Sequence, residues 1–192
     1  MRSVCICGLY EEDYKSFVSE SQLRLMGALW TLNDWYQFMP WISAPDKIWN
    51  IHTEHVNPSP DRFKWNWRNW YNQAALKGSE IVVRKMIDGV LNQRLFDEEN
   101  FKKHFGSEYA QGSISIMICQ AALDGFEEIN VIGFALKEMP YHSQVISVLN
   151  AVNYARERGI TVNVLPEGRE VQWAMRAMTL PQTNIIGYYF DQ

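Results

Sequence analysis

The sequence predicts a single-domain α/β protein with a Rossmann-like, mainly parallel sheet and helices on both faces. Short β-rich runs alternate with helical segments of about 10–15 residues, which is the pattern of βαβ units. The 192 residues fit one ordinary domain. Leu, Ile, Val and Phe together make up about a quarter of the chain, which is enough for a folded core.

The expected strands are short apolar runs bounded by Gly, Asn, His or charged residues. They cover residues 3–8, 28–32, 47–51, 80–84, 128–134 and 160–165. The expected helices carry apolar residues at helical spacing, and several of them stop at a glycine. They cover residues 11–25, 67–77, 97–105, 113–123, 143–157 and 167–178.

Charge, apolar runs and cysteines limit the class of protein. The net charge of −4 argues against a general nucleic-acid coat or a binder of anionic membranes. No uncharged apolar run approaches the ~18 residues of a membrane span, and the first residues lack a signal-peptide cleavage site. Cys5, Cys7 and Cys119 have the spacing of neither a zinc site nor an ordinary disulfide. We therefore expect a reduced, cytoplasmic protein with no metal and no resident cofactor.

Aromatic residues are unusually frequent, and they gather in the first half of the chain. They make up 14% of the residues, and seven of the eight Trp lie between Trp30 and Trp70. This Trp-rich segment, residues 30–72, and the aromatic tail, residues 180–192, exceed what one small core hides comfortably. The composition therefore predicts a homo-oligomer.

Residues 62–71 interleave basic and aromatic side chains, as stacking surfaces for single-stranded nucleic acid do. The alternative is a helix that buries Trp67, Trp70 and Tyr71 and leaves the basic side chains in solvent. The acidic balance of the chain favours the helix. A nucleic-acid partner therefore stays open but is not preferred.

Ligands of a doubly wound sheet lie outside the carboxyl ends of its strands, so the residues after each expected strand are candidates. Gly8 follows the first strand, but three acids come after it where a phosphate loop has further glycines. The alternative is a tight turn into an acidic helix. Asn33 follows the second strand, where its amide can bind a base or ribose edge or serve as a turn residue.

One further strand end and one helix start also carry polar groups. His52 follows the third strand and is either a ligand-facing or a structural histidine, and His55 alone adds too few ligands for a metal site. Gly112, Ser113 and Ser115 open an apolar helix, where the glycine allows close backbone approach and the helix start attracts anions. The serines are equally the residues expected to cap that helix.

The loop of residues 138–144 is the most chemically equipped part of the chain. Glu138, Tyr141, His142 and Gln144 bring a carboxylate, a phenol, an imidazole and an amide within seven residues. An imidazole with a pKa near neutral pH can act as a general base, so His142 is a catalytic candidate. The alternative is an ordinary solvated loop. No P-loop and no Gly-x-Ser-x-Gly motif is present.

The order of these pieces resembles the Rossmann-like domain of bacterial CMP-dependent sialyltransferases, motility-accessory flagellin glycosyltransferases and related small phage proteins. The resemblance spans roughly residues 3–166. Its motifs are a first strand ending in Gly, an Asn after the second strand, an aromatic and a His at the third, a Ser-rich helix running into a strand, and a helix ending in Arg-x-Arg-Gly-Ile. In this chain they are residues 6–8, 32–33, 49–52, 112–133 and 155–162.

The resemblance implies a nucleotide-sugar-dependent glycosyltransferase-like protein, encoded by a phage, with a CMP-linked sugar donor as co-substrate. Asn33, Gly112, Ser113 and Ser115 would face the nucleotide, together with Gly8 of the first loop. The acid–base candidates are His142, His52 and Glu138, with Tyr141 and Gln144 supporting their loop. Two motifs of the sialyltransferases are altered: residues 8–12 replace their phosphate loop, and residues 133–136 lack their acid.

Two other classes of function fit the same sequence. A binding module would keep the fold and hold a nucleotide or a protein partner without turnover. An oligomeric structural or assembly protein would use the Trp-rich half as an interface, because aromatic residues are enriched in interface cores.

Overall fold

The chain forms one sheet of seven strands that all run parallel, in the order β5-β4-β3-β2-β1-β6-β7. The structure is a computed structural model and describes residues 1–15, 19–51, 67–109, 112–136 and 144–179. The α/β prediction is confirmed, and the mainly parallel sheet proves to be wholly parallel. The strands are β1 (Ser3–Cys7), β2 (Ala28–Leu32), β3 (Lys47–Asn50), β4 (Glu80–Val83), β5 (Gln93–Leu95), β6 (Glu128–Ile132) and β7 (Thr161–Val164).

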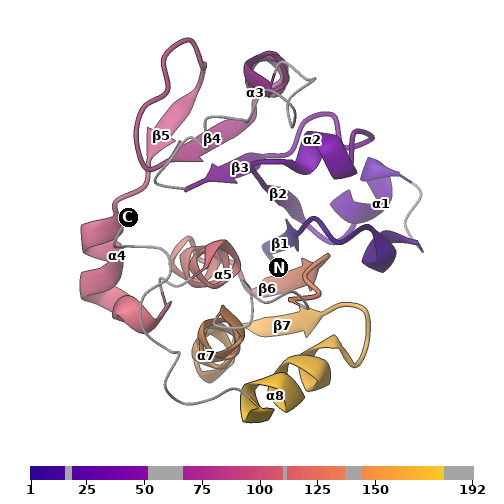
Figure 1. Cartoon of the computed structure of the whole chain (residues 1–192), viewed down its shortest axis with the longest axis vertical. Coiled ribbons are helices and arrows are strands. Elements are labelled where there is room, and N and C mark those ends of the chain that lie inside the picture. Colours follow the sequence, from indigo (N-terminus) through magenta and orange to yellow (C-terminus); the bar gives the residue numbers. More distant parts are fainter. Residues whose placement is uncertain (16–18, 52–66, 110–111, 137–143, 180–192) are drawn as a thin grey trace.

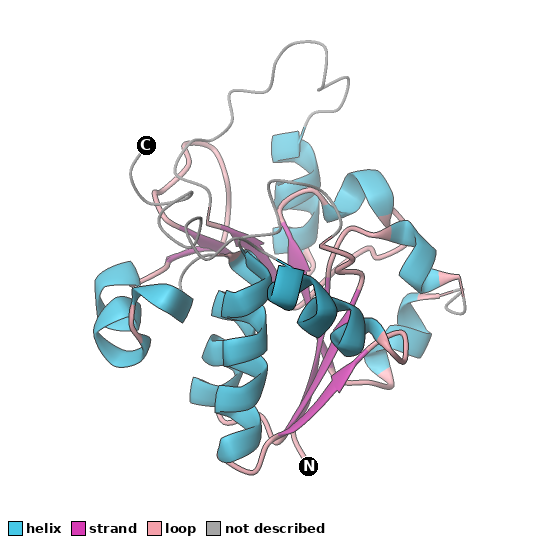
Figure 2. Ribbon diagram, turned by 60° about the horizontal axis from the view of Figure 1, so that its bottom comes forward, coloured by secondary structure: helices cyan, strands magenta, loops and turns pink. Residues whose placement is uncertain are grey.

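Helices cover both faces of the sheet, which makes the fold Rossmann-like in character (Figures 1 and 2). The helices α1, α2 and α3 pack on one face, and α5 and α7 pack side by side on the other. Their bounds are α1 (Glu20–Arg24), α2 (Trp35–Phe38), α3 (Trp67–Leu76), α4 (Glu98–Phe105), α5 (Ser113–Leu123), α7 (Gln144–Glu157) and α8 (Arg169–Thr179), with 3-10 turns η1 (Glu11–Tyr14) and η2 (Ser107–Tyr109).

The interior strand β1 shows how the two cores are built. Val4 and Ile6 point into the core that α5 and α7 cover, whereas Cys5 and Cys7 point into the core under α1, α2 and α3. All four side chains are fully buried. Successive side chains of a strand face opposite sides, so a strand covered on both faces needs an apolar residue at every position.

Two elements differ from the sequence-based expectation. The single helix expected over residues 11–25 is wrong: η1 ends at Tyr14, and Ser19 has an extended backbone before α1 begins. Serine is a weaker helix former than the apolar spacing alone suggests, and Ser19 directly precedes α1 with its hydroxyl bonded to that of Ser21 (2.9 Å). The strand β5 was not expected, because its three residues include Gln93 and Arg94 and give no apolar run.

The tryptophan side chains that the structure describes lie in the two cores or pack against them. Trp30, Trp35 and Trp49 are at most 1% exposed, and Trp41 and Trp70 are half-buried. The prediction of a homo-oligomer therefore loses its original argument for the part of the Trp-rich segment that the structure describes, and it stays a prediction.

The chain crosses the sheet once, after β5, and this crossing creates the expected place for a ligand. It passes through α4 and α5 and returns on the other side of β1, where β6 pairs with β1. Strands to the two sides of β1 are thus reached by connections of opposite direction. The crevice at the carboxyl ends of such strands is where ligands of open α/β sheets bind.

Candidate functional site

The loop after β1 is bonded directly to the loop after β6. The Gly8 N–H donates to the Ile132 carbonyl (2.7 Å), and the Tyr10 N–H donates to the Gly133 carbonyl (2.9 Å). The Tyr14 hydroxyl closes the turn by donating to the Gly8 carbonyl (2.9 Å). A Cβ at Gly8 would collide with the Gly133 backbone, so glycine is required here for close packing. The Gly8 N–H is already used and is not offered to a phosphate.

The helix α8 covers the chain where it leaves β6. The Trp173 Nε1 donates to the Phe134 carbonyl (3.1 Å), and Trp173 is fully buried. Arg176 donates to the carbonyls of Ala135 (2.8 Å) and Leu136 (2.6 Å). Three successive carbonyls after β6 are therefore bonded to α8, so this part of the carboxyl edge is filled by the protein itself.

A buried ion pair joins α8 to the loop after β1. Arg169, in the first turn of α8, bonds Asp13 of η1, and the two side chains are 6% and 2% exposed. Arg169 also donates to Gln172 (2.8 Å). Asp13 is one of the three acids that follow Gly8, and it neutralises an arginine that is 156 residues away in the sequence. Sequence spacing gives no signal for such a pair.

At the end of β2, an amide and a carboxylate lie next to each other. The Asn33 side chain donates to Asp34 (3.1 Å), and both residues are half-buried. The Asn33 carbonyl accepts a hydrogen bond from the Tyr71 hydroxyl (3.0 Å). Burial raises the pKa of Tyr71 well above its usual value, so this hydroxyl stays a donor. Asp34 was not singled out from the sequence, although its position directly after the second strand was a signal.

Aromatic stacking positions this strand end. Tyr71 stacks on Trp35 with ring centroids 5.8 Å apart, and Trp70 stacks on Tyr36 at 5.9 Å. The described end of the basic and aromatic run (residues 62–71) therefore belongs to α3, and its Trp70 and Tyr71 rings pack against α2 and form no open stacking surface. Residues 62–66 lie outside the described residues.

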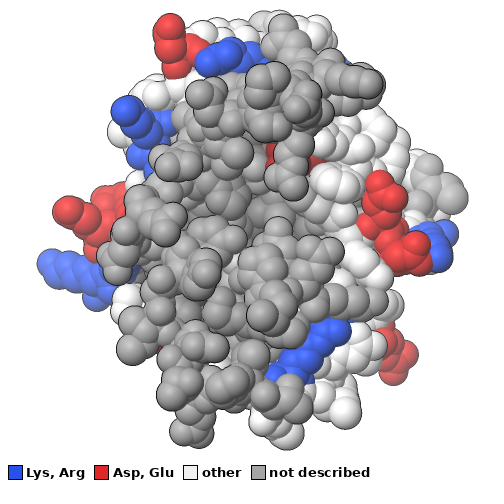
Figure 3. Space-filling view, viewed as in Figure 1, with Lys and Arg blue, Asp and Glu red and all other residues white. Residues whose placement is uncertain are grey.

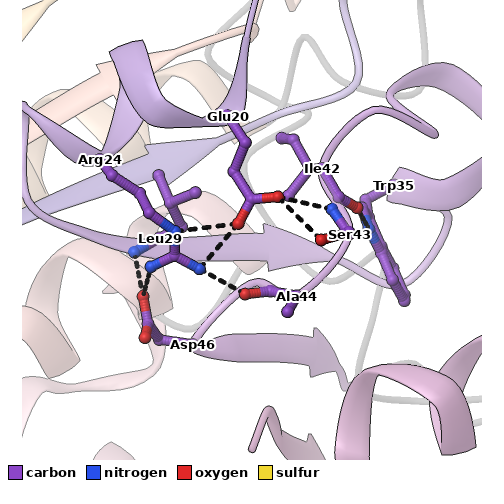
Figure 4. Close-up of polar contacts among 8 residues, drawn as sticks. All are labelled: Glu20, Arg24, Leu29, Trp35, Ile42, Ser43, Ala44 and Asp46. Atoms are coloured by element: carbon purple, nitrogen blue, oxygen red, sulfur yellow. Dashed lines mark hydrogen bonds and ion pairs between the residues drawn. The ribbon is translucent and has the colours of Figure 1, made fainter. Parts of the chain in front are cut away.

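A polar network holds the connection from α2 to β3 (Figure 4). Glu20 accepts hydrogen bonds from the Ser43 N–H (2.7 Å) and from Arg24 (2.9 Å). Arg24 also donates to Asp46 (3.0 Å), which accepts the Leu29 N–H (2.7 Å). Burial by itself raises the pKa of Glu20, but these hydrogen bonds outweigh it and hold the pKa below its usual value. The network fixes residues 43–46 against α1 and the start of β2, at the amino-terminal edge of the sheet.

The start of α5 lies where the sequence predicts it. The helix begins at Ser113 after the extended Gly112, and no side chain of the described residues caps it. Ser115 is buried and donates to the Gly112 carbonyl (2.8 Å), and its hydroxyl contacts that of Ser147 (2.9 Å). Gln144, at the start of α7, packs against Gly112. Ser115 and Gln144 thus hold the two helix starts together, and the half-buried Ser113 stays available.

The structure therefore tests the position of some predicted residues and not of others. It brings Gly112, Ser115 and Gln144 together and puts Gly8 and Asn33 at the ends of neighbouring strands. The remaining candidates lie outside the described residues: His52, Glu138, Tyr141 and His142. Within the described ranges, no group of three or more His, Cys, Asp or Glu is placed to hold a metal ion.

The surface and the helices add two findings. On the face shown in Figure 3, described basic and acidic side chains lie near one another around the rim and build no large patch of one sign. No helix in the described part of the chain is long and apolar enough to cross a membrane.

Comparison of the chain with protein-family models, curated proteins and solved structures finds no match.

Proposed function

We propose that this chain binds a mononucleotide at the half of the carboxyl edge formed by β2, β3 and the start of α5. The observation that carries the proposal is the start of α5, which no described side chain caps, on a helix that follows the crossing of the sheet. The first N–H groups of a helix and its dipole attract a phosphate. Ser113 adds a hydroxyl at the same place.

The end of β2 supplies groups for the rest of the nucleotide. The Asp34 carboxylate can accept hydrogen bonds from ribose hydroxyls, as acids at this position of Rossmann folds do. The Asn33 amide can both donate to and accept from a base. A carboxylate repels phosphate, so the phosphate is expected at the start of α5 and the ribose and base at the end of β2. The bonded loop after β1 leaves no second phosphate cradle, which favours a mononucleotide over a dinucleotide.

The sequence resemblance to CMP-dependent sialyltransferases supports a nucleotide-sugar donor and a glycosyltransferase-like activity. Direct inverting transfer needs a positioned donor and a base that takes the proton of the acceptor hydroxyl. His142 is our candidate base, with His52 and Glu138 as the other acid–base candidates. In an active enzyme, His142→Ala should lower turnover roughly 100-fold and leave nucleotide affinity nearly unchanged.

The test uses a matched pair of substitutions at the start of α5. We would measure melting temperature and calorimetric affinity with CMP, CDP, UDP, GDP and their sugar conjugates, because a specific ligand raises the melting point by mass action. Ser113→Glu adds an anion that competes with the phosphate but favours the helix, so it should abolish binding without loss of stability. Ser113→Gln is the uncharged control and should retain binding. Equal affinity in both variants would show that α5 holds no phosphate.

A second candidate, nucleotide binding without transfer, rests on a separate observation. Residues 133–136, directly after β6, contain no acid, and three of their carbonyls bond α8. A donor that binds tightly but is neither hydrolysed nor transferred over hours would favour this binding module. Release of free nucleotide from a bound nucleotide-sugar would favour the enzyme.

A further inference from the structure

The two outer strands of the sheet differ in how their free edges are covered. At β7, Arg156 reaches from α7 and donates to the outward carbonyl of Val162 (2.9 Å). The same guanidinium binds both carboxylate oxygens of Glu170 on α8 (2.6 and 2.8 Å). Charged side chains placed on an edge strand prevent pairing with another chain. The edge of β7 is therefore protected.

The edge of β5 has no such cover among the described residues. Its pairing with β4 uses alternate residues: Asn92 accepts the Ile81 N–H (3.0 Å), and Phe96 donates to the Val83 carbonyl (2.7 Å). The backbone groups of the residues between, Gln93 and Leu95, consequently face outward. Within the described ranges no group bonds them, so β5 offers N–H and C=O groups for one more strand.

Apolar side chains line the same margin of the molecule. Asn72 on α3 bonds both Gly89 (2.8 Å) and the Leu91 N–H (2.8 Å), which holds the β4–β5 loop against α3. We call the exposed apolar residues here the β5 margin, and their exposures are Leu76 76%, Met86 54%, Leu91 47% and Leu95 53%. Exposed apolar residues that gather beside unpaired backbone mark an interaction surface.

We propose that the β5 margin binds a second copy of this chain, with the two β5 strands paired antiparallel about a two-fold axis. Gln93 and Leu95 both point their backbone groups outward, so a reversed copy of the same segment offers matching donors and acceptors. A contact of this kind is isologous: each copy uses the same surface. The proposal is independent of the nucleotide site.

Charge is compatible with this pairing. Arg94, between the two outward-facing residues, is neutralised by Glu80 (3.0 Å). Exposed Lys77 lies near the start of β5, through the Asn92–Ser79 contact (2.6 Å), and exposed Asp97 follows its end. The two-fold axis reverses one copy and brings Lys77 of one copy toward Asp97 of the other.

The size of the contact sets the expected affinity. A standard stable interface uses about 20–30 residues on each side. The β5 margin and its strand, residues 86–95 with Leu76, supply about half that number. We therefore expect a weak dimer that dissociates on dilution, and not a permanent one.

The first test compares two surface substitutions that each replace an exposed apolar side chain by lysine. We would follow sedimentation velocity from 1 µM to 1 mM, concentrations that are roughly those of weak association. Leu95→Lys should weaken the dimer at least tenfold, because a charge on an edge strand opposes pairing. Met175→Lys, on the exposed face of α8 (64% exposed), is the matched control and should dimerise like the wild type. Melting curves check that both variants are folded.

Two results would overturn the proposal. The wild type could stay monomeric over the whole concentration range. Alternatively, the dimer could survive Leu95→Lys and be lost with Met175→Lys, which would put the interface on α8.

A second measurement gives a positive signal. Leu95→Cys should form a covalent dimer with a short bismaleimide linker, because the two-fold axis brings the two copies of this residue close together. The natural cysteines Cys5, Cys7 and Cys119 are buried and should not react. Met175→Cys is the control, and equal cross-linking of both variants would contradict the predicted pairing.

Discussion

The two halves of the carboxyl edge of the sheet differ in how far the protein fills them with its own groups. At β6 and β7, the protein fills the edge with its own groups: the Asp13–Arg169 ion pair and the bonds from Trp173 and Arg176 to the chain after β6. At β2 and the start of α5, polar groups at Asn33 and Ser113 are only half-buried. The first half is closed by these contacts, whereas the second is the part in which we propose that a ligand binds. A Rossmann-like topology thus offers a crevice that the local sequence can either close or leave open.

The largest effect should come from the buried ion pair. Arg169→Ala leaves the Asp13 carboxylate buried without its main partner, which typically lowers the free energy of unfolding by about 3–5 kcal/mol. Urea denaturation at pH 7 measures it. Adding Asp13→Asn to the same chain should restore part of the loss, because the uncompensated charge is removed. A loss below about 1 kcal/mol in the single variant would mean that this half is not held by the pair.

The next effect concerns the bond from α8 to the chain after β6. Trp173→Phe removes the Nε1 donor and some buried volume, so we expect the free energy of unfolding to fall by about 1–3 kcal/mol. Val171→Ala, on the exposed side of the same helix (62% exposed), is the control and should change it by less than about 0.5 kcal/mol. Similar losses in the two variants would show that α8 does not close the edge.

The amino-terminal edge of the sheet should respond to acid through Glu20, whose network reaches Leu29 near the start of β2 and Asp46 directly before β3. The pKa of Glu20 is held below its usual value in the folded protein. Its carboxylate therefore stabilises the fold fully above the pKa of a glutamate in the unfolded chain, about 4.3. This stabilisation is lost as the pH falls through the lower pKa that Glu20 has in the folded protein. Glu20→Gln should therefore cost about 1 kcal/mol at pH 7 and almost nothing near pH 3. Unfolding at both pH values gives the comparison. If Glu20→Gln lowered the free energy of unfolding equally at both pH values, the charge of Glu20 would not be the cause of the loss.

The smallest effect on stability should be at Asn33. Its side chain bonds only a neighbouring carboxylate among the contacts described above, so Asn33→Ala should lower the free energy of unfolding by about 0.5 kcal/mol. Nucleotide affinity should nevertheless fall about tenfold, the effect of one lost hydrogen bond. Asn153→Ala, at an exposed position of α7, should change neither quantity. Unchanged affinity in Asn33→Ala would separate the end of β2 from the ligand.

The sequence predicted the parts of the fold that depend on local patterns. Six of the strands have four or more residues with apolar runs, and α5 has the bounds that its spacing predicts. The strand β5 was missed because Gln93 and Arg94 give it no pattern, and it is set by its pairing with β4.

The candidate site was harder to predict, because its state depends on contacts between distant residues. The positions after β1 and β2 and at the start of α5 follow from the order of the elements. No local pattern indicates that Arg169 neutralises Asp13, that Gly8 packs against Gly133, or that Ser115 contacts Ser147. These long-range contacts decide which candidates keep a free polar group.

The position of β1 between β2 and β6 has a consequence for the synthesis of the protein. The strand is complete at Cys7, but its partner β6 begins only at Glu128. Translation at about 5–20 residues per second needs roughly 6–24 s to cover that interval. During this time one edge of β1 has no partner, and the apolar face that α5 and α7 later cover is exposed on the nascent chain. Chaperone binding or early aggregation is therefore expected to act on chains stopped before β6, and much less on chains that include α7.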